Sequence, residues 1–328
     1  MLINYLLIAT TAFLLNFFFI FILKKLAFKY NILISQGVPQ IGGIAVGISF
    51  ILTCLSVFFA NGILPKEAIG IIVAAALMLI FGIIDDTWEL SIMTKLLVQI
   101  IAVSLLIFFG VRTQIVYIGN IPNILITLLW VLGITNAFNH LDIMDGLAGA
   151  SATIISLAFL FLAILSGDIK IIVLALSLAG AICSFLIYNL PPAKIYMGNS
   201  GSHLLGFVLA SIALMISYAP MERKVALLSP ILILGLPIFD TAFLILMRFT
   251  KEKSIFKKSN DHLALRFLKK GHSKHKTLFF MLSFGLICSL SGILLTQVPN
   301  SLGLVIIASV AAVSLVIARN MSRVVIDG

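Results

Sequence analysis

Eleven long apolar runs follow one another along this chain, and they constrain its fold more than any other feature of the sequence. A run of about 20 apolar residues is long enough to cross a bilayer as an α-helix. The chain of 328 residues is 61% hydrophobic and 10% charged, whereas soluble domains are nearer half apolar and a quarter charged. The sequence therefore predicts an all-α polytopic membrane protein with about eleven transmembrane helices, in one integral-membrane domain over residues 1–328. The runs cover residues 2–23, 41–60, 68–84, 95–110, 122–138, 148–166, 169–188, 201–219, 225–247, 276–296 and 301–318.

The connectors between these runs carry unequal charge. When they are divided alternately into two sets, one set, taken with the tail from residue 319, holds 17 of the 22 Lys and Arg residues, and the other holds five. Positively charged connectors tend to stay on the cytoplasmic side. The sequence thus predicts a multi-pass protein of the inner (plasma) membrane, with the N-terminus outside and the C-terminus in the cytoplasm. Nine of the twelve acidic residues lie on the same cytoplasmic side, so the polar chemistry is expected there.

The net charge of +10 would suggest a nucleic-acid partner in a soluble protein. Here ten of the basic residues lie within 248–276, beside the membrane. Anionic lipid headgroups or a lipid phosphate explain this cluster better, so no nucleic acid is expected. A role in setting the membrane topology, without any ligand, explains most of these lysines equally well.

The same connector predicts a short amphipathic helix over 261–270, with Arg266 away from its apolar side and Gly271 as its C-terminal stop. It also contains the pair Asp261-His262. A lone His is more often a surface residue, but this pair is also able to bind phosphate if it faces the other polar motifs.

Two adjacent carboxylates, Asp85 and Asp86, stand at the end of the apolar run 68–84. They cannot both ionise cheaply near hydrocarbon unless a cation lies beside them. Hard oxygen ligands favour Mg²⁺ or Mn²⁺. The alternative is a pair at a helix end that simply faces water.

A second polar motif runs from Asn136 to Gly146 and contains Asn139, Asp142 and Asp145 at intervals of three residues. In a helix, side chains at this spacing lie along one face and shift slowly around it. One interpretation is a polar stripe that joins neighbouring helices. We favour a functional site, because four carboxylates at one depth indicate a divalent metal and phosphate chemistry.

The third motif is a polar loop with two glycines, over residues 188–202, that leads into the next apolar run. Backbone N–H groups at such a helix start can bind phosphate oxygens, and Tyr196 can stack on a nucleobase. The alternative is an ordinary capped helix start, with Asn199 or Ser200 as the cap.

Taken together, these motifs resemble the polyprenyl-phosphate N-acetylhexosamine-1-phosphate transferases of glycosyltransferase family 4. That family includes the WecA- and TagO-type enzymes and, more distantly, the MraY translocases. The resemblance covers most of the chain, from Gly42-Gly43 to about Gly271, with the motifs in the same order. It rests on Asp85-Asp86, on the motifs from Asn136 to Leu147 and from Tyr188 to Ser202, and on Pro237 to Asp240.

The resemblance implies ten or eleven helices with an active-site cleft on the cytoplasmic face, the connector 248–275 forming part of the site. It implies a magnesium-dependent enzyme, with manganese as an alternative ion. The donor is a UDP-N-acetylhexosamine, and the acceptor is a polyprenyl phosphate such as undecaprenyl phosphate. The products are a diphosphate-linked lipid sugar and UMP, in the first membrane step of a cell-envelope polysaccharide pathway. The resemblance also allows a homodimer.

The resemblance also assigns roles residue by residue. Asp85, Asp86 and Asp142 are the catalytic candidates, with Asp85 as the base that deprotonates the lipid phosphate. Asp85, Asp86 and Asn199 lie at the metal. The nucleotide and the diphosphate are contacted by Lys95, Asn139, Asp145, Asn189, Tyr196, Gly198 and His262, with Tyr196 in the stacking position on uracil.

This chain departs from the family pattern at three places. Asn199 replaces an aspartate that binds magnesium, and His262 is the one histidine left of a cluster, with Ala264 and Leu265 at the next matching places. The family's lysine in the loop before Gly42-Gly43 is also absent, where this chain reads Ser35-Gln36-Gly37. The histidine change speaks against an MraY-type enzyme, and Asn199 makes a weakened or inactive relative that binds lipid phosphate the main alternative. An ion-coupled transporter is a weaker alternative, because the chain shows no internal repeat and its acids lie on one face.

Overall fold

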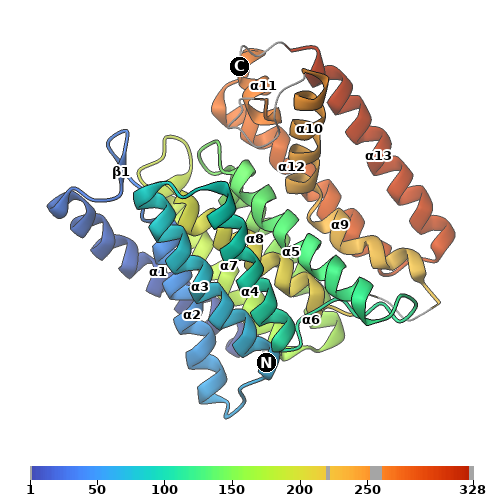
Figure 1. The fold of residues 1–328 in the computed structure, drawn as a ribbon, viewed down its shortest axis with the longest axis horizontal. Helices are drawn as coiled ribbons and strands as arrows, with labels where there is room; N and C mark the ends of the chain where they lie inside the picture. Colours follow the sequence, from blue (N-terminus) through green and yellow to red (C-terminus); the bar gives the residue numbers. More distant parts are fainter. Residues whose placement is uncertain (1, 219–221, 252–260, 325–328) are drawn as a thin grey trace. The chain divides into compact units, whose positions relative to one another are not determined.

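The computed structural model describes residues 2–218, 222–251 and 261–324 and consists almost entirely of helices (Figure 1). The described strands form one short antiparallel hairpin, β1 (Ile34–Ser35) with β2 (Val38–Pro39). The chain divides into two compact units, Met1–Ile216 and Ser217–Gly328. The expectation of an all-helical polytopic membrane protein is confirmed.

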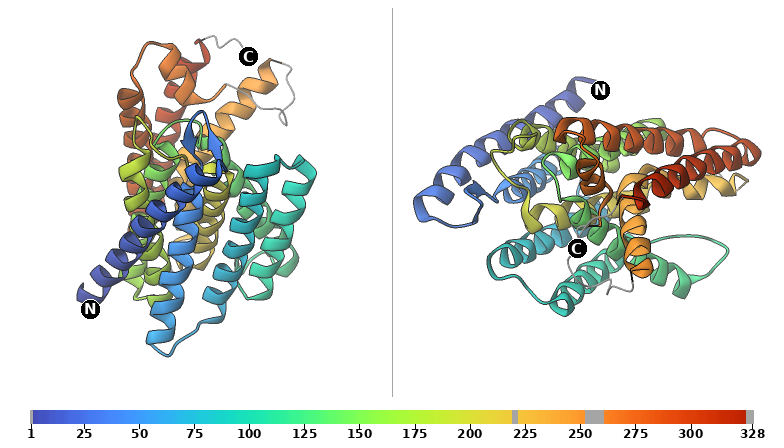
Figure 2. Two further views of the ribbon diagram at one scale, coloured as in Figure 1. Left: turned by 90° about the vertical axis from the view of Figure 1, so that its left-hand side faces the viewer. Right: turned by 90° about the horizontal axis from the view of Figure 1, so that it is seen from above.

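Unit 1 holds the hairpin and eight helices. Helix α1 crosses the other helices of this unit obliquely (Figure 2). The helices are α1 (Leu2–Tyr30), α2 (Gly42–Ala60), α3 (Lys66–Trp88), α4 (Ile92–Phe108), α5 (Asn120–Leu141), α6 (Leu147–Ser166), α7 (Ile169–Asn189) and α8 (Gly198–Met215).

Unit 2 holds a short 3₁₀ helix and five α-helices, with the predicted amphipathic helix present as α11. The elements are η1 (Lys224–Leu228), α9 (Ser229–Ile233), α10 (Gly235–Thr250), α11 (Leu263–Lys269), α12 (Lys274–Leu295) and α13 (Asn300–Ser322). Gly271 follows α11 with a φ of +92°, in the left-handed region that is typical of a C-terminal stop, as predicted. Part of the predicted cytoplasmic connector, residues 252–260, lies outside the described residues.

Within the described residues, nine helices are long and apolar enough to cross a membrane. A bent pair, Lys224–Ile233 with Gly235–Thr250, forms a tenth span if it is counted as one. The remaining predicted run, 95–110, corresponds to α4, whose 17 residues reach about 26 Å, slightly less than a hydrocarbon core of about 30 Å. Each predicted run therefore corresponds to helical structure, and the chain is a multi-pass membrane protein.

The predicted run 225–247 is wrong in one respect, because it is broken rather than continuous. Its two halves meet at an angle of 76° after Ile233. Pro237 explains the break, since its ring would clash with the carbonyl of Ile233 and it has no N–H to donate. The freed carbonyl of Ile233 accepts a hydrogen bond of 3.0 Å from the hydroxyl of Ser289 on α12. The break is thus satisfied inside unit 2 without water.

Three helices of unit 1 approach one another at backbone distance, and this contact positions the polar motifs. A Cβ added at Gly82 of α3 would overlap the Cα of Ser200 at the start of α8. A Cβ added at Gly43 of α2 would overlap the backbone of Gly201 on the other side of α8. Small residues allow membrane helices to pack this closely. The sequence therefore holds the N-terminus of α8 between α2 and α3.

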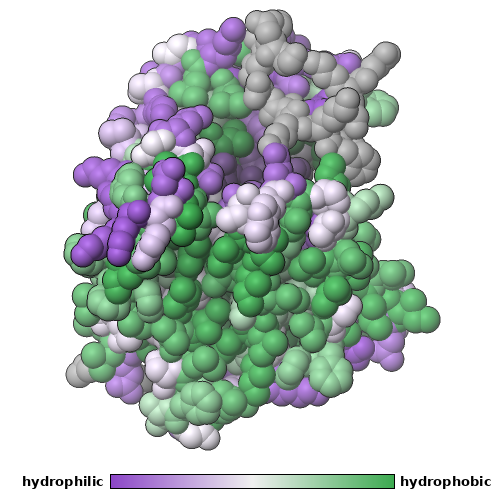
Figure 3. Space-filling view, turned by 60° about the vertical axis from the view of Figure 1, so that its left-hand side comes forward, coloured by the Kyte–Doolittle hydropathy of each residue, from purple (hydrophilic) through white to green (hydrophobic). Residues whose placement is uncertain are grey.

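The outer surface is rich in large apolar side chains, as expected when hydrocarbon is the solvent. On the face drawn in Figure 3, hydrophobic side chains form a broad band, and hydrophilic ones gather beyond its edges. Helix α13 is the extreme case, because Gly303 and Met321 are its only buried residues among those described.

We predict that Gly82→Ala destabilises the protein by about 1–3 kcal/mol or more, because the added methyl group must displace the backbone of α8. Gly133→Ala is the matched control, since Gly133 lies in α5 with open space around its missing Cβ. Thermal unfolding in detergent, followed by circular dichroism, measures both. Equal unfolding temperatures for the two variants would contradict the close contact of α3 with α8.

Candidate active site

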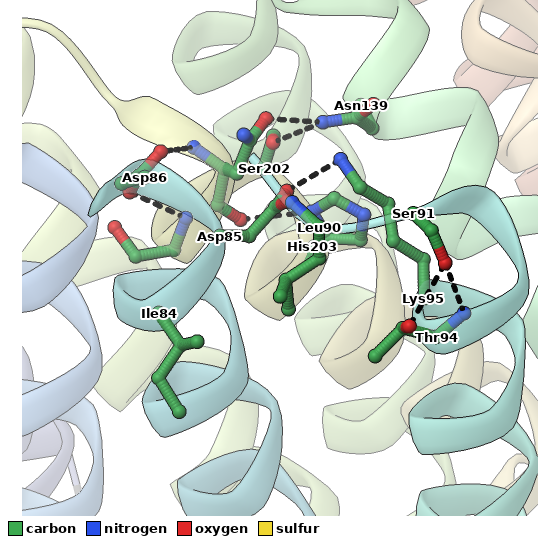
Figure 4. A network of polar contacts seen from close by, with 12 residues as sticks. Ile84, Asp85, Asp86, Leu90, Ser91, Thr94, Lys95, Asn139, Ser202 and His203 are labelled. Atoms are coloured by element: carbon green, nitrogen blue, oxygen red, sulfur yellow. Dashed lines mark hydrogen bonds and ion pairs between the residues drawn. The ribbon is translucent and has the colours of Figure 1, made fainter. Parts of the chain in front are cut away.

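The carboxylate of Asp86 caps the N-terminus of α8. Its Oδ1 accepts a hydrogen bond of 2.6 Å from the backbone N–H of Asn199, and its Oδ2 accepts one of 3.0 Å from Ser200 (Figure 4). Helix α8 has no side-chain cap of its own at Met197. The first N–H groups of a helix carry partial positive charge, so Asp86 satisfies them from a different helix.

Gly198 makes this approach possible. Its φ is +72°, and a Cβ at this position would lie 2.7 Å from Oδ2 of Asp86. Any other residue would therefore strain the backbone and press against the carboxylate. Gly198 was predicted as a contact to the diphosphate, and the structure places it beside Asp86.

Asp85 forms a separate, buried ion pair. Its Oδ2 lies 2.6 Å from Nζ of Lys95, and its Oδ1 accepts a hydrogen bond of 2.8 Å from the N–H of Leu90. Leu90 lies in the turn into α4, and Lys95 lies in α4 itself. Ser91 caps this helix by accepting a hydrogen bond from the N–H of Thr94. Asp85 thus ties the end of α3 to α4, and Lys95 neutralises one of the two adjacent carboxylates.

The asparagines of the second motif link α5 to its neighbours. The amide of Asn139 donates to Oδ1 of Asn199 and to the hydroxyl of Ser202, both at 3.0 Å. Asn136 exchanges two hydrogen bonds with Gln99 of α4, at 2.9 and 3.4 Å. Asn139 therefore lies in the predicted site next to Asn199. Asn136 instead joins two helices, as expected for a polar stripe between neighbouring helices.

Asp142 follows directly after α5, beyond the end of the membrane-spanning segment. Among the described residues, its carboxylate makes no hydrogen bond and no ion pair. Burial, and then the negative charges of Asp86 and Asp145, raise the pKa of Asp142 from 3.8 to about 7. Asp142 thus lies close enough to Asp86 and to Asp145 for their negative charges to disfavour its own ionisation.

The loop between α7 and α8 is fastened by Asn189, which is buried. Its Oδ1 accepts from the N–H of Gly146 at 3.0 Å, and its Nδ2 donates to the carbonyl of Ile195 at 2.9 Å. The N–H of Ala193 lies 3.4 Å from Oδ2 of Asp145. Asn189 therefore positions the loop that leads into α8, and its predicted contact with the nucleotide stays a prediction.

Tyr196 is half-buried, and its backbone is fixed on both sides. Its N–H donates to the carbonyl of Pro39 at 2.8 Å, and its carbonyl accepts from the N–H of Gly42 at 2.9 Å. The ring is therefore held near the start of α2 and α8. Stacking of this ring on a base stays a prediction.

Sequence reasoning missed His203, which lies one turn after Asn199 in α8. It is buried, its Nδ1 is 2.9 Å from the carbonyl of Asn199, and its ring meets Phe81 edge-to-face at 5.5 Å. Figure 4 shows it beside Asp85 and Lys95. A histidine inside an apolar run at helical spacing was the available signal, but its partners lie on other helices.

His262 belongs to unit 2. Its Nδ1 lies 2.9 Å from Oδ2 of Asp240, and Oδ1 of Asp240 accepts from the N–H of Leu263 at 3.0 Å. Asp240 thus caps α11 much as Asp86 caps α8. The contact of His262 with the nucleotide stays a prediction.

A metal ion fits the charges of unit 1. Within residues 2–218, 222–251 and 261–324, no three His, Cys, Asp or Glu side chains are arranged to hold a metal by themselves. Magnesium, however, is usually bound by one or two carboxylates together with water and substrate phosphates. The negative charge of Asp86 acts on Asp142, and the backbone N–H of Asn199 donates to Asp86. Asp85 is a weaker ligand candidate because Lys95 already neutralises it.

Comparison with known proteins identifies the family. The profile of glycosyl transferase family 4 matches residues 68–217. A Bacillus subtilis protein named "Probable undecaprenyl-phosphate N-acetylglucosaminyl 1-phosphate transferase" is 33% identical over 82% of this chain and 76% of its own length. The decaprenyl-phosphate N-acetylglucosaminephosphotransferase of Mycobacterium tuberculosis is 32% identical over 74% of this chain and 68% of its own.

A more distant relative covers less of the sequence. The phospho-N-acetylmuramoyl-pentapeptide-transferase of Streptococcus thermophilus is 30% identical over 56% of this chain and 60% of its own length. The aspartate pair, the motif around Asp142 and the whole of α8 lie within the segment matched by the family profile. The chain therefore belongs to glycosyl transferase family 4, the family of polyprenyl-phosphate N-acetylhexosamine-1-phosphate transferases.

Proposed function

We propose that this protein transfers N-acetylhexosamine 1-phosphate from a UDP-sugar to a polyprenyl phosphate and releases UMP. The observation that carries the proposal is the meeting of Asp85, Asp86, Asp142 and Asp145 with the N-terminus of α8 in one unit. The relatives named above act on undecaprenyl or decaprenyl phosphate and N-acetylglucosamine 1-phosphate. No observation favours a transporter.

In this reaction an oxygen of the lipid phosphate attacks the sugar-bearing phosphorus of the donor. The bond from that phosphorus to the oxygen bridging it to the UMP phosphorus breaks, and UMP leaves with that oxygen. Both substrates are anionic, so positioning and charge neutralisation supply most of the catalysis. Lys95 and the N–H groups of α8 are the fixed positive elements near the carboxylates.

We assign Asp85 as the group that takes the remaining proton from the lipid phosphate. Both of its oxygens already accept hydrogen bonds, from Lys95 and from the N–H of Leu90.

Asp86 and Asp142, with the amide oxygen of Asn199, would hold a magnesium ion when one binds. The ion supplies neutralisation of the two phosphates and of the carboxylates themselves. Asn199 supplies an oxygen ligand without charge, so this site should bind magnesium less tightly than one with an aspartate there. Asn139 fixes the orientation of this amide through its hydrogen bond of 3.0 Å.

The proposed orientation follows the positive charge of the connectors. The ends of α3 and α5 and the start of α8 carry the site, and the connectors there belong to the lysine-rich and arginine-rich set. We place this end of unit 1 in the cytoplasm, where nucleotide sugars are made, and the protein in the plasma membrane.

We predict that Asp85→Asn lowers UMP release from UDP-N-acetylglucosamine and undecaprenyl phosphate by about a hundredfold or more, because a proton acceptor contributes on the order of 10²–10⁴. The control is Asp168→Asn, since Asp168 caps α7 by accepting from the N–H of Lys170 and Asn caps a helix as well as Asp. Its activity should match that of the unchanged protein. Full activity of Asp85→Asn, or no UMP release from any UDP-N-acetylhexosamine by the unchanged protein, would contradict the proposal.

We also predict a pH dependence that originates at Asp142. Its pKa in the folded protein is about 7, above the ordinary 3.8, so the folded state holds a proton that the unfolded state has lost. Stability in EDTA should therefore fall as pH rises from about 4 to 7, by roughly 5 °C in Tm. Magnesium should reduce this fall, because it favours the ionised carboxylate.

Asp142→Asn separates this residue from the other titrating groups. Thermal unfolding in detergent, in EDTA and in magnesium, should show a smaller change of Tm over this pH range in the variant, and no further reduction by magnesium. A variant with the same pH dependence as the unchanged protein in EDTA would exclude Asp142 as the source.

A further inference from the structure

Helix α4 carries Lys95, but apolar burial does not hold the start of this helix in place. The structure describes the whole of α4, and its first buried residue is Gln99. Near the start of the helix, Ile92 is 47% exposed and Met93 is 78% exposed. The apolar residues that α4 buries all follow Gln99. The first two turns of α4 therefore depend on polar contacts for their position.

Two polar contacts hold these turns. Lys95 forms its ion pair with Asp85 of α3 at 2.6 Å (Figure 4). One turn further on, the amide of Asn136 in α5 donates to Oε1 of Gln99 at 2.9 Å, and the amide of Gln99 donates to Oδ1 of Asn136 at 3.4 Å. Residues four apart lie on the same side of a helix. One side of α4 is thus joined to α3 by charge and to α5 by a pair of amides.

The amide of Asn136 is itself held in one orientation. Its Nδ2 also donates to the carbonyl of Leu132 in its own helix at 2.8 Å. Gln99 is 1% exposed, so without this partner its amide would be left unpaired near hydrocarbon. Hydrogen bonds between membrane helices add little to stability on average. The main effect of the pair is therefore to fix the orientation of α4 against α5.

Helix α5 connects this pair to the candidate active site. Asn139 lies about one turn after Asn136, and its amide donates to Oδ1 of Asn199 and to the hydroxyl of Ser202, both at 3.0 Å. One turn of α5 thus holds α4, and the next turn holds the start of α8. The separation of Lys95 from Asn199 is therefore set through α5.

We infer that Gln99 is a positioning residue. Through its paired hydrogen bonds with Asn136 it holds the first two turns of α4 against α5, and this places the ammonium group of Lys95 beside Asp85. The inference deepens the proposed function and rests on it for the catalytic consequence, because Lys95 is one of the fixed positive elements near the carboxylates. The position of Lys95 is testable without turnover.

The first test measures the coupling between the amide pair and the ion pair by thermal unfolding in detergent with EDTA. Gln99→Met/Asn136→Leu replaces both amides by apolar side chains of similar size, so the pair is removed without leaving one amide unpaired. Lys95→Met should lower the Tm of the unchanged protein by about 4–8 °C, because Asp85 stays buried without its cation. In the double variant the same substitution should lower Tm by less than half as much, because Lys95 is already displaced.

Asp168→Ala is the matched control, because it removes the side-chain cap of α7, whose hydrogen bonds are to Lys170 and Ile171. It should lower Tm equally in the unchanged protein and in the double variant. The exchanged pair Gln99→Asn/Asn136→Gln supplies both amides again and should restore the full effect of Lys95→Met. Additive effects of Lys95→Met and of the double variant on Tm would overturn the inference.

The second test follows UMP release. The double variant should lower kcat by about tenfold to a hundredfold and change the KM for the UDP-sugar by less than about threefold, because a displacement of about 1 Å can cost a hundredfold in rate. An unchanged kcat in the folded double variant would also overturn the inference. If the unchanged protein releases no UMP, the proposed function fails, and the unfolding experiment still decides whether Gln99 positions Lys95.

Discussion

The active end of unit 1 depends on one interaction, the hydrogen bonds from the N-terminus of α8 to the carboxylate of Asp86. A helix start needs an acceptor, and α8 receives it from α3 rather than from its own cap residue. Gly82 and Gly198 remove the side chains that would keep the two helices apart. Helix packing and electrostatics therefore specify the same geometry, which is how a buried carboxylate can be kept near hydrocarbon.

The negative charges of Asp85, Asp86 and Asp142 are neutralised to different degrees. Asp85 has Lys95 at 2.6 Å, and Asp86 has two N–H groups of α8. Asp142 is buried beside the charges of Asp86 and Asp145, and burial first and these two charges second raise its pKa to about 7. This imbalance is the physical reason to expect a divalent cation and anionic substrates here. The asparagine at position 199 adds no further negative charge to this group.

Much of this organisation could be predicted from the sequence because the signals are local. Apolar runs predict spans, Gly271 predicts the end of α11, and acids in an apolar chain predict a polar site. The break after Ile233 was missed although Pro237 was visible, because the run is apolar on both sides of it. The sequence also could not show that Arg266 is buried, since the carbonyls it binds lie more than 50 residues further along the chain.

The roles of Asn189 and Asn136 could not be predicted from the sequence for the same reason. Both belong to polar motifs, and both amides are used to join segments of unit 1 to one another. Residue type predicts that a buried amide has partners, but not whether the partner is backbone or ligand. Contacts between distant segments decide that question, and they are fixed by the packing of α3, α5 and α8.

The most direct test of the central claim is the position of a metal ion. Crystals grown with Mn²⁺ and UDP, measured at the manganese absorption edge, report that position through anomalous scattering. The account predicts a peak at about 2.0–2.2 Å from a carboxylate oxygen of Asp86 or Asp142, the distance usual for small divalent ions. A manganese ion bound elsewhere in the chain, with these carboxylates uncontacted, would contradict it.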